Sequence, residues 1–197
     1  MGGVFHSMVT QGHVRINPLL STTHGYLGLF RSHGQRIFVE REDGFALLGV
    51  PSAFEMTPSG ARWIYADAGA RIEVRSWAPV DRHELWLAVE VQAGGPLRFR
   101  ISSHVAVNGD YGPDATPLRL ERDAGGVAVR FLPDTDLGRR FPEGSFRFGP
   151  APGTSFERVG GDELLFEDGR SRGQPFLVID SGPTRSFALR ITGHLVG

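Results

Sequence analysis

The chain of 197 residues contains neither cysteine nor lysine. Because it has no cysteine, it can form no disulfide, no catalytic thiolate and no cysteine-ligated zinc or iron–sulfur site. Because it has no lysine, Schiff-base chemistry and the lysine of a phosphate-binding P-loop are also excluded. All 21 basic side chains are therefore arginines, a usage typical of a GC-rich bacterial genome.

The sequence also lacks an excess of charge of one sign and a long apolar run. Its 21 basic residues are balanced by 22 acidic ones, which gives a formal net charge of -1 without a basic stripe. We therefore expect no nucleic-acid partner. No apolar segment approaches the length of a bilayer crossing, so we expect no membrane partner. The N-terminal residues lack the basic region and apolar core of a secretory signal, which favours a cytoplasmic location.

Motifs that hold metals or nucleophiles are scarce as well. The seven histidines form no H-x-H or H-E-x-x-H pattern, so we expect no metal and no cofactor. The segment GRSRG at 169–173 is not assigned as a nucleophile elbow. No pair of carboxylates stands out as the acid and base of a glycoside hydrolase. We therefore assign no catalytic residue and expect no catalytic activity from this segment alone.

The chain is rich instead in glycine, proline and short alternating segments. With 27 glycines and 13 prolines, few windows could hold an uninterrupted helix. Apolar residues on every second position predict strands, and many short strands in succession are typical of an antiparallel sandwich. We predict one all-β domain over residues 1–197, an antiparallel β-sandwich with helices of at most a single turn. The predicted strands are 14–17, 27–31, 35–40, 46–50, 53–58, 62–67, 71–77, 84–92, 97–105, 118–123, 127–132, 145–149, 163–167, 175–180 and 184–192.

The segment 71–112 contains three alternating strands whose apolar residues are expected to share one face. A three-residue connection at 93–95, with glycine available for its left-handed position, would join the second and third strands. That register predicts Glu90 opposite Arg98 and Trp86 opposite Ser102. A six-residue connection at 78–83 between the first and second strands predicts Arg75 opposite Trp86.

The other face of these strands combines aromatic and charged side chains. Trp77 and Trp86 could stack on sugar rings while arginines and carboxylates bind the hydroxyl groups. Alternatively, a second layer of the sandwich or a neighbouring domain covers this face and packs the arginine stems. Both interpretations stay open at this point.

Two polar loops supply further candidates. His104 is followed by Asp110 and Tyr111 in the segment SSHVAVNGDYG, where a histidine near an aspartate could act as a general base or the residues could simply form a turn. Tyr26 lies in a segment of small hydroxylated residues that could bind a ligand or satisfy its own backbone. The predicted ligand-binding residues are Trp77, Trp86, Arg75, Arg98, His104, Asp110, Tyr111 and Tyr26.

The central segment resembles the N-terminal β-supersandwich domain of glycoside phosphorylases of the cellobiose and chitobiose phosphorylase type. The resemblance rests on the turn Trp77-Ala78-Pro79 with Asp81, the aliphatic strand 84–91, and the strand 97–104 with the polar loop 109–111. Gly25, Tyr26 and the segment REDG at 41–44 precede them in the expected order. The resemblance covers the larger part of the chain.

This resemblance implies a sandwich associated with carbohydrate-active enzymes. In that family the catalytic acid and the phosphate-binding residues lie mainly in a helical barrel that follows the sandwich, so no catalytic residue is carried over to this chain. The implied partner is a saccharide or a neighbouring catalytic domain. We expect a non-catalytic, carbohydrate-associated module.

Two other functions are kept as alternatives. A mutarotase-like aldose epimerase, on a related supersandwich, would use His104 as the acid and Glu163 or Glu167 as the base. An interaction module would use the face that bears arginine and tryptophan to dock a partner or to form a homodimer.

Overall fold

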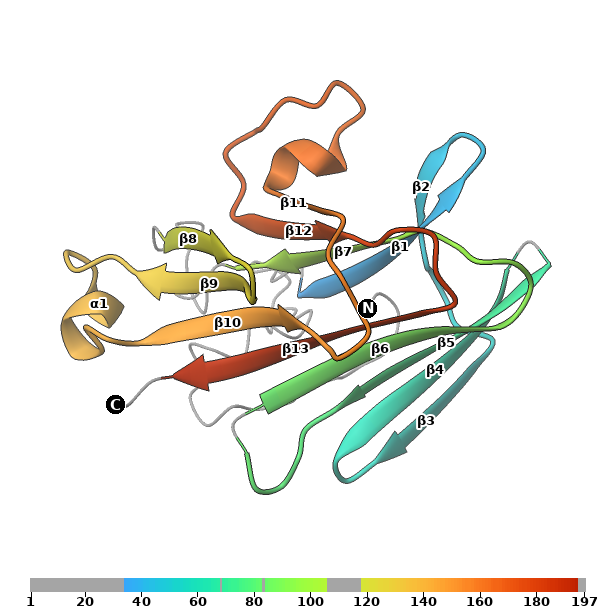
Figure 1. The fold of residues 1–197 in the computed structure, drawn as a ribbon, viewed down its shortest axis with the longest axis horizontal. Helices are drawn as coiled ribbons and strands as arrows, with labels where there is room; N and C mark the ends of the chain where they lie inside the picture. The colour runs from blue at the N-terminus through green and yellow to red at the C-terminus, as the bar shows by residue number, and fades with distance from the viewer. Residues whose placement is uncertain (1–33, 68, 83, 106–117, 195–197) are drawn as a thin grey trace, which may run out of the picture.

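The computed structural model describes residues 34–67, 69–82, 84–105 and 118–194 (Figure 1). These residues form mainly strands. The strands are β1 (Gln35–Arg41), β2 (Gly44–Leu47), β3 (Ala53–Thr57), β4 (Gly60–Asp67), β5 (Ala70–Trp77), β6 (Glu84–Ala93), β7 (Phe99–His104), β8 (Leu118–Asp123), β9 (Gly126–Phe131), β10 (Ser145–Pro150), β11 (Arg158–Gly160), β12 (Phe176–Asp180) and β13 (Ser186–His194). Two short helices join them, α1 (Asp136–Arg140) and the 3-10 helix η2 (Asp162–Leu165).

The strands form two antiparallel sheets. The eight-stranded sheet has the order β3-β4-β5-β6-β13-β10-β9-β8, and the five-stranded sheet has the order β11-β12-β7-β1-β2. In Figure 1, β12, β7 and β1 lie above β10, β13 and β6. The two sheets therefore make two layers, each with one face toward the other.

The facing sides of the two sheets share one hydrophobic core. Phe99 and Ile101 of β7, Leu87 and Val89 of β6, and Phe148 of β10 are each at most 1% exposed and belong to the same cluster. Each of these strands alternates buried apolar residues with more polar ones, as a strand with one buried face must. The predicted all-β antiparallel sandwich is confirmed.

Most predicted strands occur within a few residues of their expected bounds, but 163–167 is wrong. That stretch falls on η2, and the strand next to it, β11, was missed. Strand pairing fails here because the Asp162 carboxylate accepts the backbone N–H groups of Arg172 and Gln174 and so closes a loop. The predicted strands 14–17 and 27–31 lie outside the described residues.

The helix α1 agrees with the expectation of single-turn helices. It begins after Thr135, whose Oγ1 accepts the Gly138 N–H at 3.0 Å, the usual arrangement of an N-cap. Asp136 lies in its first turn and Arg140 in its last, which suits the helix dipole. These local signals are enough for one short helix between β9 and β10.

The predicted hairpin at 93–95 is wrong. The strands β6 and β7 belong to different sheets, and β6 lies between β5 and β13. Trp86 is therefore opposite Arg190 rather than Ser102, and Arg98 has no place opposite Glu90. Since Pro96 cannot donate a hydrogen bond, it does not extend a β6–β7 ladder. Instead, Leu97 donates to Thr184 at 2.9 Å as the chain crosses to the other sheet.

The predicted pairing of the first two central strands puts each side chain on the correct face of the sheet, but its register is shifted by two residues. Residues 78–83 do separate β5 from β6, and Val74 and Val89 share the buried face. Trp77 lies opposite Trp86, however, and Arg75 lies opposite Ala88. A shift of two residues keeps every side chain on its face, so alternation alone could not reveal it.

The core assignment predicts a large loss of stability for Phe99→Ala. This ring is 0% exposed, and its removal leaves a cavity between the sheets, which costs about 3–5 kcal/mol. Urea unfolding followed by tryptophan fluorescence measures the free energy of unfolding. The control is Val80→Ala, because Val80 is 98% exposed and its truncation should change stability by less than about 0.5 kcal/mol. Equal losses for the two variants would contradict the assignment.

Candidate functional site

Two indole rings stack on the outward face of the eight-stranded sheet. Trp77 and Trp86 have ring centroids 5.7 Å apart and an interplanar angle of 11°. The guanidinium carbon of Arg190 lies 5.7 Å from the centre of the Trp86 ring. The Trp86 Nε1–H donates to Glu84 Oε2 at 3.1 Å. Trp86 is therefore held by three neighbours, and Trp77 forms the free end of the stack.

A groove opens beside Trp77 because its other cross-strand neighbour is a glycine. Gly60 of β4 pairs with Trp77, and Thr57 of β3 pairs with Gly60. No side chain therefore occupies the row between Thr57 and Trp77, which leaves an open groove of about 270 Å³. A Cβ atom on Gly60 would lie 2.8 Å from the carbonyl oxygen of Ser76, so the floor fits glycine best. The lining residues are Glu55, Thr57, Gly60, Ala61, Arg62, Arg75, Ser76 and Trp77.

Two arginines border the groove and share one carboxylate. Arg62 Nε donates to Glu73 Oε2 at 2.8 Å, and Arg75 Nε lies 3.2 Å from Glu73 Oε1. Arg62 Nη1 also donates to Glu55 Oε2 at 3.0 Å. The hydrogen bonds to Glu73 and Glu55 raise the pKa of the Arg62 guanidinium. The groove thus offers a flat apolar ring, fixed cationic donors and carboxylate acceptors within one open surface.

Two of the predicted site residues, Arg75 and Trp77, line this groove, Trp86 stacks on Trp77 beside it, and two others lie elsewhere. Trp77, Trp86 and Arg75 share the outward face of the eight-stranded sheet. Arg98 precedes β7 of the other sheet, where its Nη1 donates to a carboxylate oxygen of Glu157 at 2.5 Å. Placing Arg98 beside the tryptophans was therefore wrong, because it followed from the incorrect β6–β7 hairpin.

His104 also belongs to the five-stranded sheet. Its ring centroid lies 5.0 Å from that of Phe176, its cross-strand neighbour. Tyr26, Asp110 and Tyr111 lie outside the described residues. The carboxylate of Glu163, a proposed base, accepts the Gly161 N–H at 2.8 Å. Its pairing with His104 in a mutarotase stays a prediction.

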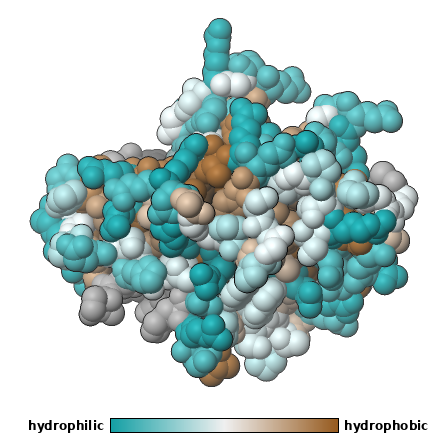
Figure 2. Space-filling view, viewed as in Figure 1, coloured by the Kyte–Doolittle hydropathy of each residue, from teal (hydrophilic) through white to brown (hydrophobic). Residues whose placement is uncertain are grey.

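The loop 161–174 covers part of the outward face of the five-stranded sheet. Arg100 of β7 donates to both oxygens of Asp180 at 2.7 and 2.8 Å and to the carbonyl oxygen of Leu164 in η2. Its guanidinium also lies 4.0 Å from the centre of the Phe45 ring. In Figure 1 this loop arches above β11 and β12, and Figure 2 shows hydrophilic side chains over it. The open groove, in contrast, lies on the outward face of the eight-stranded sheet.

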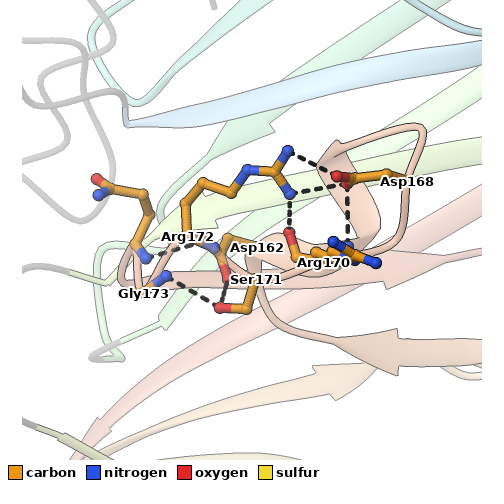
Figure 3. A network of polar contacts seen from close by, with 7 residues as sticks. Asp162, Asp168, Arg170, Ser171, Arg172 and Gly173 are labelled. Carbon is orange, nitrogen blue, oxygen red and sulfur yellow. Dashed lines mark hydrogen bonds and ion pairs between the residues drawn. The ribbon is translucent and has the colours of Figure 1, made fainter.

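Ser171 lies at the centre of this loop, in a sequence with the spacing of a nucleophile elbow. Residues 169–173 read Gly-Arg-Ser-Arg-Gly, which does match G-x-S-x-G with Ser171 at its centre, although no elbow was assigned from the sequence. An elbow needs a strand before the serine and a helix after it. Here neither is present; the Ser171 Oγ donates to Asp162, as Figure 3 shows. The serine closes a loop and is not set up as a nucleophile.

Among the described residues, no group of three or more His, Cys, Asp or Glu side chains converges in a way that could hold a metal ion. No helix in the described part of the chain is long and apolar enough to cross a membrane. The groove beside Trp77 is lined by aromatic, arginine and carboxylate side chains, among others.

Comparison with known proteins decides the family. The family model described as the glycoside phosphorylase supersandwich domain matches residues 1–193. This chain belongs to that supersandwich family. A 1,2-beta-oligoglucan phosphorylase from Listeria innocua serovar 6a is 26% identical over 148 residues, which are 75% of this chain and 13% of that protein. The supersandwich domain therefore spans a small part of its relative.

A solved structure described as a kojibiose phosphorylase from the human microbiome is also similar. It shares 10% sequence identity with the supersandwich domain, with a TM-score of 0.40, over 82% of this chain and 22% of that one.

Sequence reasoning missed Gly60 and Arg62, and it placed Glu73 on the polar face without including it among the predicted ligand-binding residues. Glu73 does share its outward phase with Arg75 and Trp77, since the three occupy every second position of β5. The register of β4 against β5 was needed to bring Arg62 and Gly60 beside them. The signal available in the sequence was the glycine at position 69, because tight hairpin turns favour glycine where φ is positive. In the structure Gly69 has a φ of 80°.

The loop 161–174 generates a prediction about acid. Burial tends to raise the pKa of the Asp162 carboxyl, but hydrogen bonds from Ser171, Gln174 and Arg172 outweigh it and lower the pKa below its ordinary value. Because the folded pKa is depressed, the stabilisation is present above about pH 4 and is lost as the pH falls through the folded pKa.

We therefore expect Asp162→Asn to lower the free energy of unfolding at pH 7 by about 2 kcal/mol, with the difference from wild type shrinking in strong acid. Urea unfolding at a series of pH values measures this. Asp81→Asn, at an exposed carboxylate between β5 and β6, is the control. A difference that is independent of pH would contradict the role of the carboxylate.

Proposed function

We propose that this supersandwich domain is a non-catalytic carbohydrate-associated module of a glycoside phosphorylase, and that it binds saccharide in the groove beside Trp77. The observation that carries the proposal is the stacked indole pair at the end of an open groove with a glycine floor. The name of the similar Listeria protein, 1,2-beta-oligoglucan phosphorylase, suggests β-1,2-linked gluco-oligosaccharide as the ligand to test first.

The chemistry of the groove fits a pyranose chain. A sugar ring has an apolar face of C–H groups that packs on an indole, and hydroxyl groups at its rim that both donate and accept hydrogen bonds. Trp77 supplies the flat surface, while Arg62 and Arg75 supply donors and Glu55 supplies an acceptor. Because Trp77 is already stacked on Trp86, little side-chain entropy is lost when a sugar binds.

Binding is better supported than catalysis. The groove is an open surface rather than an enclosed site, so it would not expel water from around a reacting bond. The carboxylates beside it are paired with arginine: Glu55 lies 3.0 Å and Glu73 2.6 Å from Arg62 nitrogens.

We expect titration with β-1,2-gluco-oligosaccharides to change the tryptophan fluorescence of the wild-type domain. Replacing Trp77 with alanine should weaken the affinity by about tenfold, measured by isothermal titration calorimetry, because the stacking surface is lost. Phe45→Ala is a matched control, since Phe45 also has an arginine over its ring but lies on the other sheet. Absence of any response to gluco-oligosaccharides would reject saccharide binding.

An interaction module is the second candidate, and β3 is the observation that favours it. This strand is an edge of the eight-stranded sheet, and all five of its residues are exposed. Phe54 is 37% and Met56 is 65% exposed on the same side of the strand. Among the devices that protect an edge strand, proline and a bulge are both absent from β3.

A second copy of the chain, pairing edge to edge along β3, is the partner that this candidate requires. Sedimentation velocity over a range of concentrations should then show self-association of the wild type, and Met56→Lys should abolish it by placing a charge on the apolar edge. The exposed variant Val80→Lys is the control, because Val80 lies outside the strands. A wild-type domain that stays monomeric while binding sugar would reject this candidate.

A further inference from the structure

Glu73 is buried on a face that otherwise points to solvent. Its side chain is 6% exposed, whereas those of Arg62 and Arg75 beside it are 37% and 48% exposed. Gln92 Nε2 donates to Glu73 Oε2 at 2.5 Å, and Arg62 Nη2 lies 2.6 Å from the same oxygen. The carboxylate therefore lies beneath the two arginines and is satisfied by them and by one amide.

The arginines around Glu73 also have partners farther out. Arg62 reaches Glu55 at 3.0 Å, and Arg75 Nη2 lies 3.7 Å from Glu90 Oε2. On the other side, Arg71 Nε donates to Gln92 Oε1 at 2.7 Å. We call this set the Glu73 network, and its members are Glu55, Arg62, Arg71, Glu73, Arg75, Glu90 and Gln92. With three arginines and three glutamates, its formal charge is zero.

We propose that Glu73 is the positioning residue of the groove, and that the balanced charge of its network makes the groove selective for neutral saccharide chains over sugar phosphates. This inference rests on the proposed function and names the ligand class of the same site. Glu73 touches no ligand itself. It holds Arg62 and Arg75 so that their remaining N–H groups border the space next to Trp77.

The position of the arginines matters because long side chains lose rotamer entropy when a ligand fixes them. Arg62 is engaged by Glu73 through both Nε and Nη2, on one edge of its planar guanidinium. A guanidinium held in this way keeps its orientation. Because Nη1 and Nη2 each carry two hydrogens, one hydrogen on each is left to donate to a ligand, although Nη1 also binds Glu55. A buried carboxylate that fixes two such groups before binding therefore lowers the cost of binding.

The charge balance favours neutral ligands for a separate reason. Sugar hydroxyls both donate and accept, so they can use the arginines and the carboxylate of Glu55 together. A phosphate only accepts and carries a charge of about -2. Both of the nearest cations are already neutralised by carboxylates, so a phosphate would gain little attraction and would meet two exposed glutamates.

The experiment compares wild type, Glu73→Gln, Glu90→Gln and Glu121→Gln by isothermal titration calorimetry. The ligands are a β-1,2-gluco-oligosaccharide, glucose and glucose 1-phosphate, each at low and high salt. Glu121 lies near the other edge of the same sheet, where its carboxylate accepts from Arg130 Nε at 2.7 Å. Its replacement removes a similar ion pair without touching the groove. Thermal unfolding checks that each variant is folded.

We expect wild type to bind glucose at least as tightly as glucose 1-phosphate and to prefer the oligosaccharide. Glu73→Gln should weaken oligosaccharide binding by about tenfold, because the arginines lose their shared carboxylate. It should also strengthen glucose 1-phosphate binding by about fivefold at low salt, since the network becomes cationic. High salt should remove this gain. A merely structural role would not reverse ligand preference in this way.

The Glu90→Gln variant tests the effect of net charge while the arginines keep their positions. It can still be measured if Glu73→Gln does not fold. It adds the same net charge but leaves Glu73 and both arginines in place, so phosphate binding should rise while oligosaccharide binding stays within about twofold. Glu121→Gln should change neither.

Three outcomes would overturn the inference. Unchanged oligosaccharide affinity in folded Glu73→Gln would reject the positioning role while leaving the proposed function intact. Tight glucose 1-phosphate binding by wild type would reject the neutral ligand class. If wild type binds none of the sugars, the proposed function fails and the inference fails with it.

Discussion

Burial of one apolar face on each sheet is the constraint on which the rest of this domain depends. Side chains such as Phe99, Ile101 and Phe148 are completely excluded from solvent, and each contributes about 1.5–3 kcal/mol relative to exposure. Because successive residues of a strand point to opposite faces, fixing Val74 and Val89 inward also fixes Trp77 and Trp86 outward. The polar and aromatic face is thus the direct complement of the core.

The outward faces of the two sheets differ in whether a loop covers them. On the five-stranded sheet, Arg100 and its contacts with Asp180 and Leu164 attach the loop 161–174 over the strands. On the eight-stranded sheet, the row that contains Gly60 and Trp77 stays open. The mixed polarity of this groove is the feature on which the proposed saccharide site rests.

Rigidity on this face comes from side chains that hold one another. Trp86 stacks on Trp77 and also contacts the Arg190 guanidinium. Glu73 forms ion pairs with Arg62 and Arg75 from beneath them. Ion pairs on a surface contribute little to stability individually. Their consequence here is orientation, because a carboxylate buried among its donors leaves them few alternative rotamers. A groove on a flat sheet can therefore have a defined shape without walls of backbone.

The sequence by itself determined most of the strands, their inward and outward phases, and the family. Period-two alternation is a local property, so the positions of Trp77, Trp86 and Arg75 on one face could be predicted without any partner strand. Which strands are neighbours was decided only by the tertiary structure. The placement of Arg98, the two-residue shift between β5 and β6, and the assembly of Gly60, Arg62 and Glu73 all depend on pairings between distant segments. Alternation is satisfied equally by a neighbour in the same sheet, by one shifted by two residues, and by one across the core. Only the packing of the whole chain selects among these three pairings. There the turn lengths, the position of proline and the volume of the core must all be compatible with one arrangement.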